Sequence, residues 1–457
     1  MRPTLAHPRQ SLEAIFRVAL CAVEGGRVVE RVLQVGAEGP VLAGRPLRAG
    51  ARVFVLAAGK AALPMAVVAE QRLAGRIARG VAVIRDAAGA RLERIAVHEA
   101  AHPVPDARSA SAGREALRLA AEAEPEDVLL VLLSGGASSL LSCPLPGLTL
   151  EDLASTTQRL LAAGADIFAL NTVRKHLTQV AGGRLAAASR AGWIEVWAIS
   201  DVLGDDLSTI ASGPCMGDPT TYAQAREILR AHGLSGRGPR AALAVLEEGA
   251  AGARPETPKP GAPELAAVRS RILARNADAL RAAEGEARDQ GLEPLQVTGS
   301  LRGEARVAGT RLGALCRALR PGPPRLLLAG GETTVTVRGN GLGGRSQELA
   351  LAAALRLAGT SGATLLAAGT DGSDGPTGAA GAFADGETVA RGSAAGVEAG
   401  ACLRRNDSHD FFAHEGGLLV TGPTGTNVMD LVLARVERLG EAPPRAVGVP
   451  RIHEQSP

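Results

Sequence analysis

The chain contains little lysine, few aromatic residues and no long apolar run. Only three of its 50 cationic residues are lysine (Lys60, Lys175 and Lys259), a bias toward arginine that is typical of genome composition but makes each lysine worth inspecting. No stretch approaches the ~20 apolar residues that would span a bilayer, and Met1–Leu20 lacks the apolar core of a signal peptide. The net charge is only +3 and no basic block is present, so we expect neither a membrane nor a nucleic acid as partner.

Cysteine is also scarce and gives no sign of a structural or metal-binding role. The five cysteines are scattered and lack the spacing of metal ligands (Cys21, Cys143, Cys215, Cys316 and Cys402). They are interpreted as incidental reduced thiols, which persist in a reducing compartment. We therefore predict a cytoplasmic protein, and the sequence leaves a homodimer open. His98 and His102 flank no carboxylate motif, and we expect both to be surface or core residues.

What the chain does contain is a recurring boundary between apolar and glycine-rich sequence. Six apolar runs each stop in a small, polar, glycine-rich turn that opens a helix pattern. These runs are Val53–Ala57, Val128–Leu133, Ile194–Ile199, Leu326–Ala329, Ala363–Ala368 and Gly417–Val420. Continuous apolar runs are typical of buried parallel strands, and such sheets bind ligands beyond the carboxyl ends of their strands.

The alternation of strand and helix patterns predicts an α/β fold, and 457 residues predict at least two domains. Residues 1–252 are expected to form a Rossmann-like domain with a mostly parallel, doubly wound sheet. The Pro-, Gly- and Ala-rich segment Ala250–Pro263 is the best linker candidate. Residues 262–457 are expected to form a mixed α/β domain, because Thr333–Val337 alternates like a half-exposed hairpin strand. A ligand site is expected in the cleft between them.

The first two strand-end turns carry groups that bind anions. Lys60 directly follows the first strand and precedes a helix pattern, whose free N–H groups attract anions; a solvated surface lysine is the alternative. The turn after the second strand supplies glycines that let the backbone approach a ligand, together with hydroxyl donors. Its candidate ligands are Ser134, Gly135, Gly136, Ser138 and Ser139. A tight turn with a helix cap is the alternative there, and the G-x-S-x-G spacing of a serine nucleophile is absent.

A basic cluster follows farther along the chain. Asn171 resembles the N-cap of a helix over Thr172–Ala191, whose first turns carry Arg174 and Lys175. Cations at a helix amino terminus oppose the helix dipole, so we expect a bound anion or nearby carboxylates to compensate them. An interdomain salt-bridge patch is the alternative.

Acidic turns end three other strands. Asp201 follows the third run, Glu332 the fourth, and Thr370, Asp371 and Asp374 the fifth. Carboxylates opposite a phosphate cradle are what Mg²⁺ and a substrate hydroxyl need, although Asx-turns and helix caps explain many such aspartates. We expect Asp371, Asp374 and Glu332 to hold the metal, Thr370 to contact phosphate and Asp201 to act in catalysis. Asp201 and Asp371 are the first choices for a direct metal contact.

The strongest local signal is a glycine-rich segment that ends at Arg345. Gly343 and Gly344 lead into a helix pattern over Ser346–Leu357, with the arginine at its mouth. Backbone amides, the helix dipole and a guanidinium fork would all converge on one anion there. A glycine-rich hairpin turn is the alternative. Taken alone, the candidate residues predict an α/β enzyme that handles a phosphorylated or multiply anionic ligand between two domains.

Six long motifs occur in order: LSGGASSLL, NTVRKHLTQVAGGRLA, SDVLGDDLSTIASGPCMGDPTT, LAGGETTVTVRGNGLGGRSQELALA, AAGTDGSDGPTGAAGAF and GLLVTGPTGTN. This set resembles the glycerate 2-kinase family from about Gly59 to Val428. The resemblance implies an amino-terminal α/β domain followed by a domain known for a leucine-rich fragment. It also implies that ATP and a divalent metal such as Mg²⁺ serve the phosphorylation of D-glycerate on its 2-hydroxyl, giving 2-phosphoglycerate and ADP. Lys60 and Arg345 match the lysine and arginine that the family is thought to use in the interdomain cleft.

An NAD(P)H-dependent hydroxypyruvate reductase is the alternative function, because relatives have often carried that label. Such an enzyme usually has G-x-G-x-x-G after its first strand, with an acidic residue ~20 positions later. The first strand instead ends in Ala-Ala-Gly-Lys60, and the similar segment Gly339–Gly344 follows a hairpin-like pattern late in the chain. Because aromatic residues are only 2% of the chain, an adenine base is expected to lie against aliphatic side chains.

Overall fold

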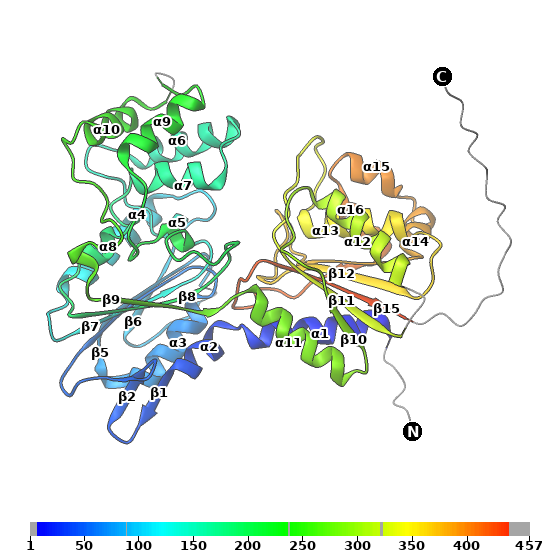
Figure 1. Ribbon diagram of the computed structural model, residues 1–457, viewed down its shortest axis with the longest axis horizontal. Helices are drawn as coiled ribbons and strands as arrows, with labels where there is room; N and C mark the ends of the chain where they lie inside the picture. The colour runs from blue at the N-terminus through cyan, green and yellow to red at the C-terminus, as the bar shows by residue number, and fades with distance from the viewer. Residues whose placement is uncertain (1–6, 88, 236–237, 320–322, 438–457) are drawn as a thin grey trace, which may run out of the picture.

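The computed structural model describes residues 7–87, 89–235, 238–319 and 323–437, which form two α/β units (Figure 1). The first unit is built on six parallel strands in the order β6-β5-β4-β7-β8-β9. These are β4 (Val53–Ala58), β5 (Ile77–Ile84), β6 (Ile95–Glu99), β7 (Val128–Leu133), β8 (Trp193–Ile199) and β9 (Val268–Ala274). Every residue of β4, β7 and β8 is buried, which explains their continuous apolar sequences.

Helices cover both faces of this sheet, so the doubly wound architecture is confirmed. α2 (Gly25–Val32) and α3 (Ala62–Leu73) pack with Val53 and Val55 of β4, whereas α4 (Ala107–Glu122) packs with Phe54 and Leu56 on the opposite face. A small antiparallel sheet joins the first face, with strands β1 (Leu33–Gly36), β2 (Gly39–Leu42) and β3 (Arg45–Pro46).

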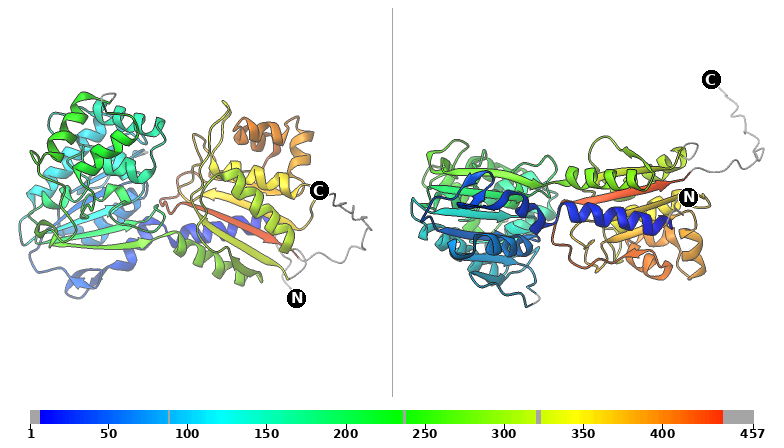
Figure 2. Two further views of the ribbon diagram at one scale, coloured as in Figure 1. Left: turned by 45° about the horizontal axis from the view of Figure 1, so that its top comes forward. Right: turned by 90° about the horizontal axis from the view of Figure 1, so that it is seen from below.

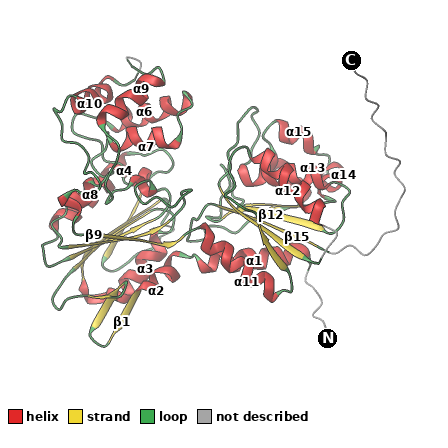
Figure 3. Ribbon diagram, in the orientation of Figure 1, coloured by secondary structure: helices red, strands yellow, loops and turns green. Residues whose placement is uncertain are grey.

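A group of helices stands apart from this sheet and has its own apolar core (Figure 3). Its members are α6 (Leu150–Ala162), α7 (Ile167–Lys175), α9 (Tyr222–Ala231) and α10 (Arg240–Ala250). Two short helices, α5 (Ala137–Leu140) and α8 (Arg184–Ala187), lie between this group and the sheet. None of the helices in the described ranges combines the length and the apolarity that crossing a membrane requires.

The second unit is built on a mixed sheet in the order β10-β11-β15-β12-β13-β14, as expected. Its strands are β10 (Glu293–Gln296), β11 (Arg325–Gly331), β12 (Ala363–Gly369), β13 (Gly381–Asp385), β14 (Leu418–Leu419) and β15 (Asp430–Val436). β15 runs antiparallel to both of its neighbours, and its first residue, Asp430, pairs with Gly331 of β11 and Gly369 of β12. The start of β15 therefore lies at the same sheet edge as the carboxyl ends of β11 and β12.

Helices also cover both faces of the second sheet. One face carries α12 (Ala305–Leu319), α13 (Arg345–Leu357), α14 (Thr388–Ala394), α15 (Ala399–Arg404) and α16 (Ser408–Glu415). The other face carries α11 (Asn276–Asp289) and the amino-terminal helix α1 (Pro8–Ala22), which lie side by side under the sheet (Figure 2).

Sheet membership differs from the expected domain ranges at two places. β9 lies in the range 262–457 but pairs with β8 and completes the first sheet. α1 lies in the range 1–252 but packs against α11, β12 and β15 of the second unit. The chain therefore crosses between the units twice, once between α1 and α2 and once between β9 and α11. We propose Arg275, which follows β9, as the later boundary in place of Ala250–Pro263.

Three local predictions are wrong, each for an identifiable reason. Thr333–Val337 forms no hairpin strand, because only Thr334 makes an isolated bridge, to Glu304. The run Gly417–Val420 contributes only the two residues of β14, which pair antiparallel with β13. The helix expected over Thr172–Ala191 does not form as one element, because α7 ends at Lys175 and Thr178 forms an isolated bridge to Pro144. Gly182 and Gly183, with positive φ angles of 60° and 82°, then precede the separate helix α8.

Candidate functional site

The strand-end turns of the two units meet at the boundary between the sheets, here called the seam. Lys60 follows β4, and its ammonium forms an ion pair with Asp371, which follows β12 of the other unit. Its backbone N–H donates to Gly135 O at 2.9 Å. Burial raises the pKa of Asp371, but the Lys60 charge and hydrogen bond outweigh this effect and lower it overall. Lys60 therefore links both sheets at one point.

Arg345, the first residue of α13, joins the same cluster. Its guanidinium binds Asp430 in bidentate fashion, with Nε–Oδ2 and Nη2–Oδ1 distances of 2.6 and 2.9 Å, and its Nη1 lies 2.5 Å from Glu332 Oε1. Burial lowers the pKa of Arg345, but attraction to both carboxylates raises it overall. Asp430 was not predicted from the sequence, because it begins a strand instead of ending one.

Asp201 is a partly exposed carboxylate of the cluster that is surrounded by protein atoms. It follows β8, and its Oδ2 accepts a hydrogen bond from Asn427 Nδ2 at 3.0 Å across the seam. A Cβ on Gly135 would lie only 1.9 Å from this oxygen, so the close approach requires glycine. Burial raises the pKa of Asp201 to about 6, opposed by Lys60 and reinforced by Glu332 and Asp371. A carboxyl group of this pKa can exchange a proton near neutral pH.

The cluster contains more negative than positive charge. Four carboxylates (Asp201, Glu332, Asp371 and Asp430) face the two cations, Lys60 and Arg345. Burial raises the pKa values of Glu332 and Asp430, and neighbouring carboxylates add to the rise against the opposing pull of Arg345. Such an excess of oxygen ligands suits a hard divalent cation, which in phosphate sites needs only one or two carboxylates. No three of these carboxylates lie close enough to share an ion by themselves in this conformation.

The Ser134–Ser139 turn lies in the cluster, but part of it serves the fold. Ser134 Oγ accepts from the backbone N–H of Ala61 at 2.9 Å, which fixes the turn that carries Lys60 to the start of α3. Gly136 has a φ of 89° and contacts the ring of His102, while Ser138 O accepts from Arg174 Nη2 at 3.3 Å. Ser139 is buried at 6% exposure. Gly135, Gly136 and Ser138 thus remain the members nearest the site.

The glycine-rich approach to α13 binds an internal anion instead of an open ligand site. Asp374 Oδ1 and Oδ2 accept from the backbone N–H groups of Ser346 and Gln347 at 3.0 and 2.8 Å, and the Gln347 side chain adds a third donor. Asp374 is therefore the helix cap and not an available metal ligand. Gly344 is glycine because a Cβ would lie 2.3 Å from Asp374 Cγ, and a Cβ on Gly343 would lie 2.3 Å from Ser408 Oγ.

Thr370 also has a structural role in place of the predicted phosphate contact. Its hydroxyl donates to Met429 O at 2.6 Å and accepts from Val428 N–H at 2.8 Å, and the residue is fully buried. These bonds tie the end of β12 to the start of β15. They hold Asp430 next to the turn that carries Asp371.

The predicted basic cluster after Asn171 divides in the structure. α7 starts at Ile167 with Asp166 as its cap, so Asn171 lies inside the helix and Arg174 and Lys175 lie in its last turn, where cations are favourable. Lys175 is buried and pairs with Asp218 at 3.4 Å, which makes it a structural ion pair away from the seam. Only Arg174 lies against the Ser134–Ser139 turn.

Two features of the site escaped the sequence analysis. His102 packs against Gly136, and its pKa falls to about 4, chiefly through burial and then through Lys60 and Arg85. A pocket of about 280 Å³ opens at the seam beside Asp201. Its walls come from both units and include Val202, Leu203, Leu280, Gly330, Gly331 and Met429. Gly330 and Gly331 line this pocket and lack side chains because Asn276 and the backbone of Leu301 approach them closely.

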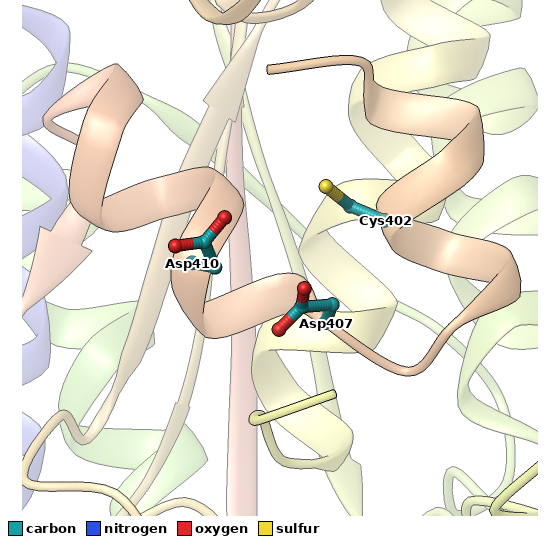
Figure 4. A group of neighbouring side chains, drawn as sticks. All are labelled: Cys402, Asp407 and Asp410. Carbon is teal, nitrogen blue, oxygen red and sulfur yellow. The ribbon is translucent and has the colours of Figure 1, made fainter. Parts of the chain in front are cut away.

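A second group of possible metal ligands consists of Cys402 on α15, Asp407 at the N-cap of α16 and Asp410 on α16 (Figure 4). Asp407 accepts from the backbone N–H of Leu342 at 2.9 Å, and Asp410 lies 3.5 Å from His414. Burial raises the pKa of the Cys402 thiol, which disfavours the thiolate that a metal would need. The three residues are explained by local structure.

Comparison with known proteins agrees with this geometry. Two family descriptions match, a domain of unknown function (DUF4147) over residues 11–247 and the MOFRL family over residues 325–430. A glycerate 2-kinase of Pyrococcus horikoshii is 39% identical over 424 residues, or 92% of this chain and 95% of that protein. A crystal structure of a glycerate kinase from Thermotoga maritima has a TM-score of 0.80 at 36% identity, covering 94% of this chain and 99% of its own. An Agrobacterium vitis protein with the provisional name hydroxypyruvate reductase is 39% identical, covering 93% of each chain. The chain belongs to the glycerate 2-kinase family.

Proposed function

We propose that the protein is a glycerate 2-kinase, which transfers the γ-phosphoryl group of ATP to the 2-hydroxyl of D-glycerate and releases 2-phosphoglycerate and ADP. The observation that carries the proposal is the seam cluster, where Lys60 of one unit pairs with Asp371 of the other beside Arg345. Phosphoryl transfer needs cations on the transferring group, a metal with carboxylate ligands, and a group that accepts the hydroxyl proton. The cluster offers candidates for all three.

Lys60 and Arg345 are the proposed anion-binding and catalytic cations. Negative charge on the phosphoryl oxygens is stabilised by cations that are already held in place, which lowers the barrier by several kcal/mol. Asp430 fixes the plane of the Arg345 guanidinium through two hydrogen bonds, so the arginine is oriented before a ligand binds. Lys60 reaches the same point from the opposite unit. These two groups would then contact the reacting phosphate together.

Asp371 and Glu332 are the proposed ligands of Mg²⁺, with Asp430 beside them and Asp374 removed from the set by its capping role. The excess of carboxylates over cations supports this assignment. Bound there, Mg²⁺ supplies positive charge to the phosphate oxygens of the nucleotide.

Asp201 is the proposed general base. Its pKa of about 6 keeps most of its carboxylate ionised at pH 7 while leaving it basic enough to accept a proton. Asn427 holds Oδ2 by a hydrogen bond, and the missing side chain at Gly135 allows both groups to approach the backbone closely. In this arrangement Asp201 accepts the proton of the 2-hydroxyl while the hydroxyl oxygen of the substrate attacks the γ-phosphorus.

The pocket at the seam is the proposed place for the nucleoside of ATP. Val202, Leu203, Leu280 and Met429 supply aliphatic walls, and the pocket adjoins the acidic side of the cluster through Gly331. A base held against aliphatic residues fits a chain with few aromatic side chains. The triphosphate would extend from this pocket toward Glu332 and Asp371.

A reductase has less support at the residue level. The turn after β4 lacks the glycine pattern of a dinucleotide site, and the helix that follows Gly339–Gly344 already has its amino terminus capped by Asp374. A pyrophosphate would have to displace that carboxylate. We also propose a cytoplasmic location, because all five cysteines are free.

Two coupled assays test the function. ATP with D-glycerate is followed by enolase without a mutase, because enolase accepts 2-phosphoglycerate directly and thereby reports the position of phosphorylation. NADH or NADPH with hydroxypyruvate is followed in parallel. We expect turnover only in the first assay, with Lys60→Met as the matched inactive control. Reduction of hydroxypyruvate without ATP-dependent product would overturn the proposal.

A further inference from the structure

Arg174 is a cation without an anionic partner. It lies in the last turn of α7, and its Nη2 donates to Ser138 O at 3.3 Å. No carboxylate in the described ranges forms an ion pair with it. Burial lowers its pKa, with no neighbouring carboxylate to offset the effect. It also lines a small cavity with the polar residues Ser138, Thr178 and Ser212. A desolvated guanidinium in this setting is stabilised when a ligand supplies the missing anion.

His102, in the loop between β6 and α4, packs against the same turn and also has free hydrogen-bonding capacity. Its Nε2 would lie 3.1 Å from a Cβ on Gly136, so the ring rests directly on that glycine. No hydrogen bond joins either ring nitrogen to another residue in the described part of the chain. Lys60, Arg85 and Arg174 all lie close enough to disfavour the charged ring. The imidazole therefore offers a neutral donor or acceptor beside several cations.

The two sides of the seam differ in charge. The second unit presents Glu332, Asp371 and Asp430, which favour a metal-bound triphosphate. The first unit presents Lys60, Arg174 and the His102 ring, and only one carboxylate of the cluster, Asp201. A small organic anion without a metal is therefore better matched to the first unit.

We propose that Arg174 and His102 form the subsite for the carboxylate of the acceptor substrate. The guanidinium pairs with the carboxylate, and a ring N–H of His102 donates to it, which directs the neighbouring 2-hydroxyl toward Asp201 and Lys60. This subsite rests on the proposed function, because D-glycerate is the acceptor that it would orient. Both residues act by direct contact with substrate.

Binding without nucleotide is the first test, and it uses the full-length protein. Isothermal titration calorimetry with D-glycerate should give a dissociation constant about 30-fold larger for Arg174→Gln and about tenfold larger for His102→Asn. Arg226→Gln removes an exposed cation of α9 in the same unit and should change nothing. Affinity for ATP should stay within about threefold in all variants. A loss of ATP affinity with unchanged glycerate affinity would assign the two residues to the nucleotide and overturn the proposal.

A substrate analogue separates carboxylate recognition from a general loss of activity. D-Glyceramide keeps the 2-hydroxyl but replaces the carboxylate by a neutral amide. The preference of the parent for glycerate over glyceramide, measured as the ratio of kcat/KM values, should fall about tenfold or more in Arg174→Gln. Equal losses for both acceptors would contradict the assigned contact.

Two controls keep the outcomes distinct. If Arg174→Gln melts below the assay temperature, Arg174→Lys keeps the charge without the planar fork and should show the same change in preference to a smaller degree. If the parent protein does not phosphorylate glycerate at all, the proposed function fails. If the parent is active and both Arg174 variants keep its glycerate affinity and its preference, only the subsite fails.

Discussion

Replacing Asp201 by Asn should inactivate the enzyme and stabilise the protein at the same time. The pKa of Asp201 rises from an ordinary value of 3.8 to about 6, mainly because the carboxylate is buried. A rise of this size corresponds to about 3 kcal/mol of free energy of unfolding that is lost when the group ionises in the folded state. Asn has nearly the same shape as the protonated acid, its carbonyl oxygen can still accept from Asn427, and it never ionises.

The contribution of Asp201 makes the stability of the parent depend on pH. Because the pKa is raised on folding, the folded protein holds the proton more tightly than the unfolded chain, so stability falls as pH increases from about 4 to about 6 and stays lowered above that range. The difference in stability between Asp201→Asn and the parent should be near zero at pH 4 and approach about 3 kcal/mol at pH 7. Urea unfolding at both pH values, in EDTA and without substrate, measures this difference.

Asp201→Asn should also lose most of its activity. Loss of a general base typically lowers kcat by about 10²–10⁴. In the parent, kcat/KM should fall tenfold per pH unit below about pH 6, and this dependence should disappear from the residual activity of Asp201→Asn. A variant that is less stable than the parent at pH 7, or that keeps kcat within tenfold, would refute the account of Asp201 as a desolvated base.

Four further perturbations test the rest of the cluster. Lys60→Met should lower kcat/KM by about 10³, or roughly 4 kcal/mol, and should also lower the melting temperature because it removes the charge that stabilises the Asp371 carboxylate; steady-state kinetics and a thermal melt measure both. Arg345→Leu should cause a similar loss and also destabilise the fold by about 3 kcal/mol, since it leaves Asp430 buried and unpaired; adding Asp430→Asn should restore stability in urea unfolding without restoring activity. Asp374→Ala should lower the free energy of unfolding by about 1–2 kcal/mol, because it removes the cap of α13. The folded fraction of this variant should still regain activity when Mg²⁺ is added after EDTA treatment. Excess EDTA should abolish phosphorylation by the parent and added Mg²⁺ should restore it, so full activity in EDTA would contradict the metal assignment.

The sequence predicts those parts of the site that depend on local order along the chain. Lys60 and Asp201 directly follow buried strands, and parallel strands bring their carboxyl ends to one edge, so their convergence followed from sequence position. Arg345 was found by its place at the start of a helix. For Lys60 and Asp201 the apolar run before the residue identified the strand from which the side chain extends, and for Arg345 the glycine-rich segment before it identified the start of the helix.

The remaining parts depend on contacts that a local pattern does not contain. Asp430 begins β15, and only the antiparallel pairing of that strand with β11 and β12 brings its first residue to the site. Asp374 follows a strand just as Asp371 does, yet three donors from α13 convert it into a helix cap. Arg174 was selected for a helix start that does not exist, because the true cap, Asp166, lies one turn earlier.

The connection between α1 and α2, where the chain crosses between the units, contacts the loop that positions Asp201. The connection between α1 and α2 is hydrogen-bonded to the loop before β15: Thr426 Oγ1 donates to Val23 O at 2.6 Å, and Gly25 N–H donates to Gly425 O at 3.1 Å. The next residue of that loop, Asn427, holds Asp201 of the opposite unit. Any change in the angle between the units therefore acts on the same loop that positions the proposed base. The carboxylates proposed as metal ligands belong to the second unit, whereas Asp201 and Lys60 belong to the first. Neither unit therefore contains the proposed chemistry alone, and the complete cluster exists only where the two sheets meet.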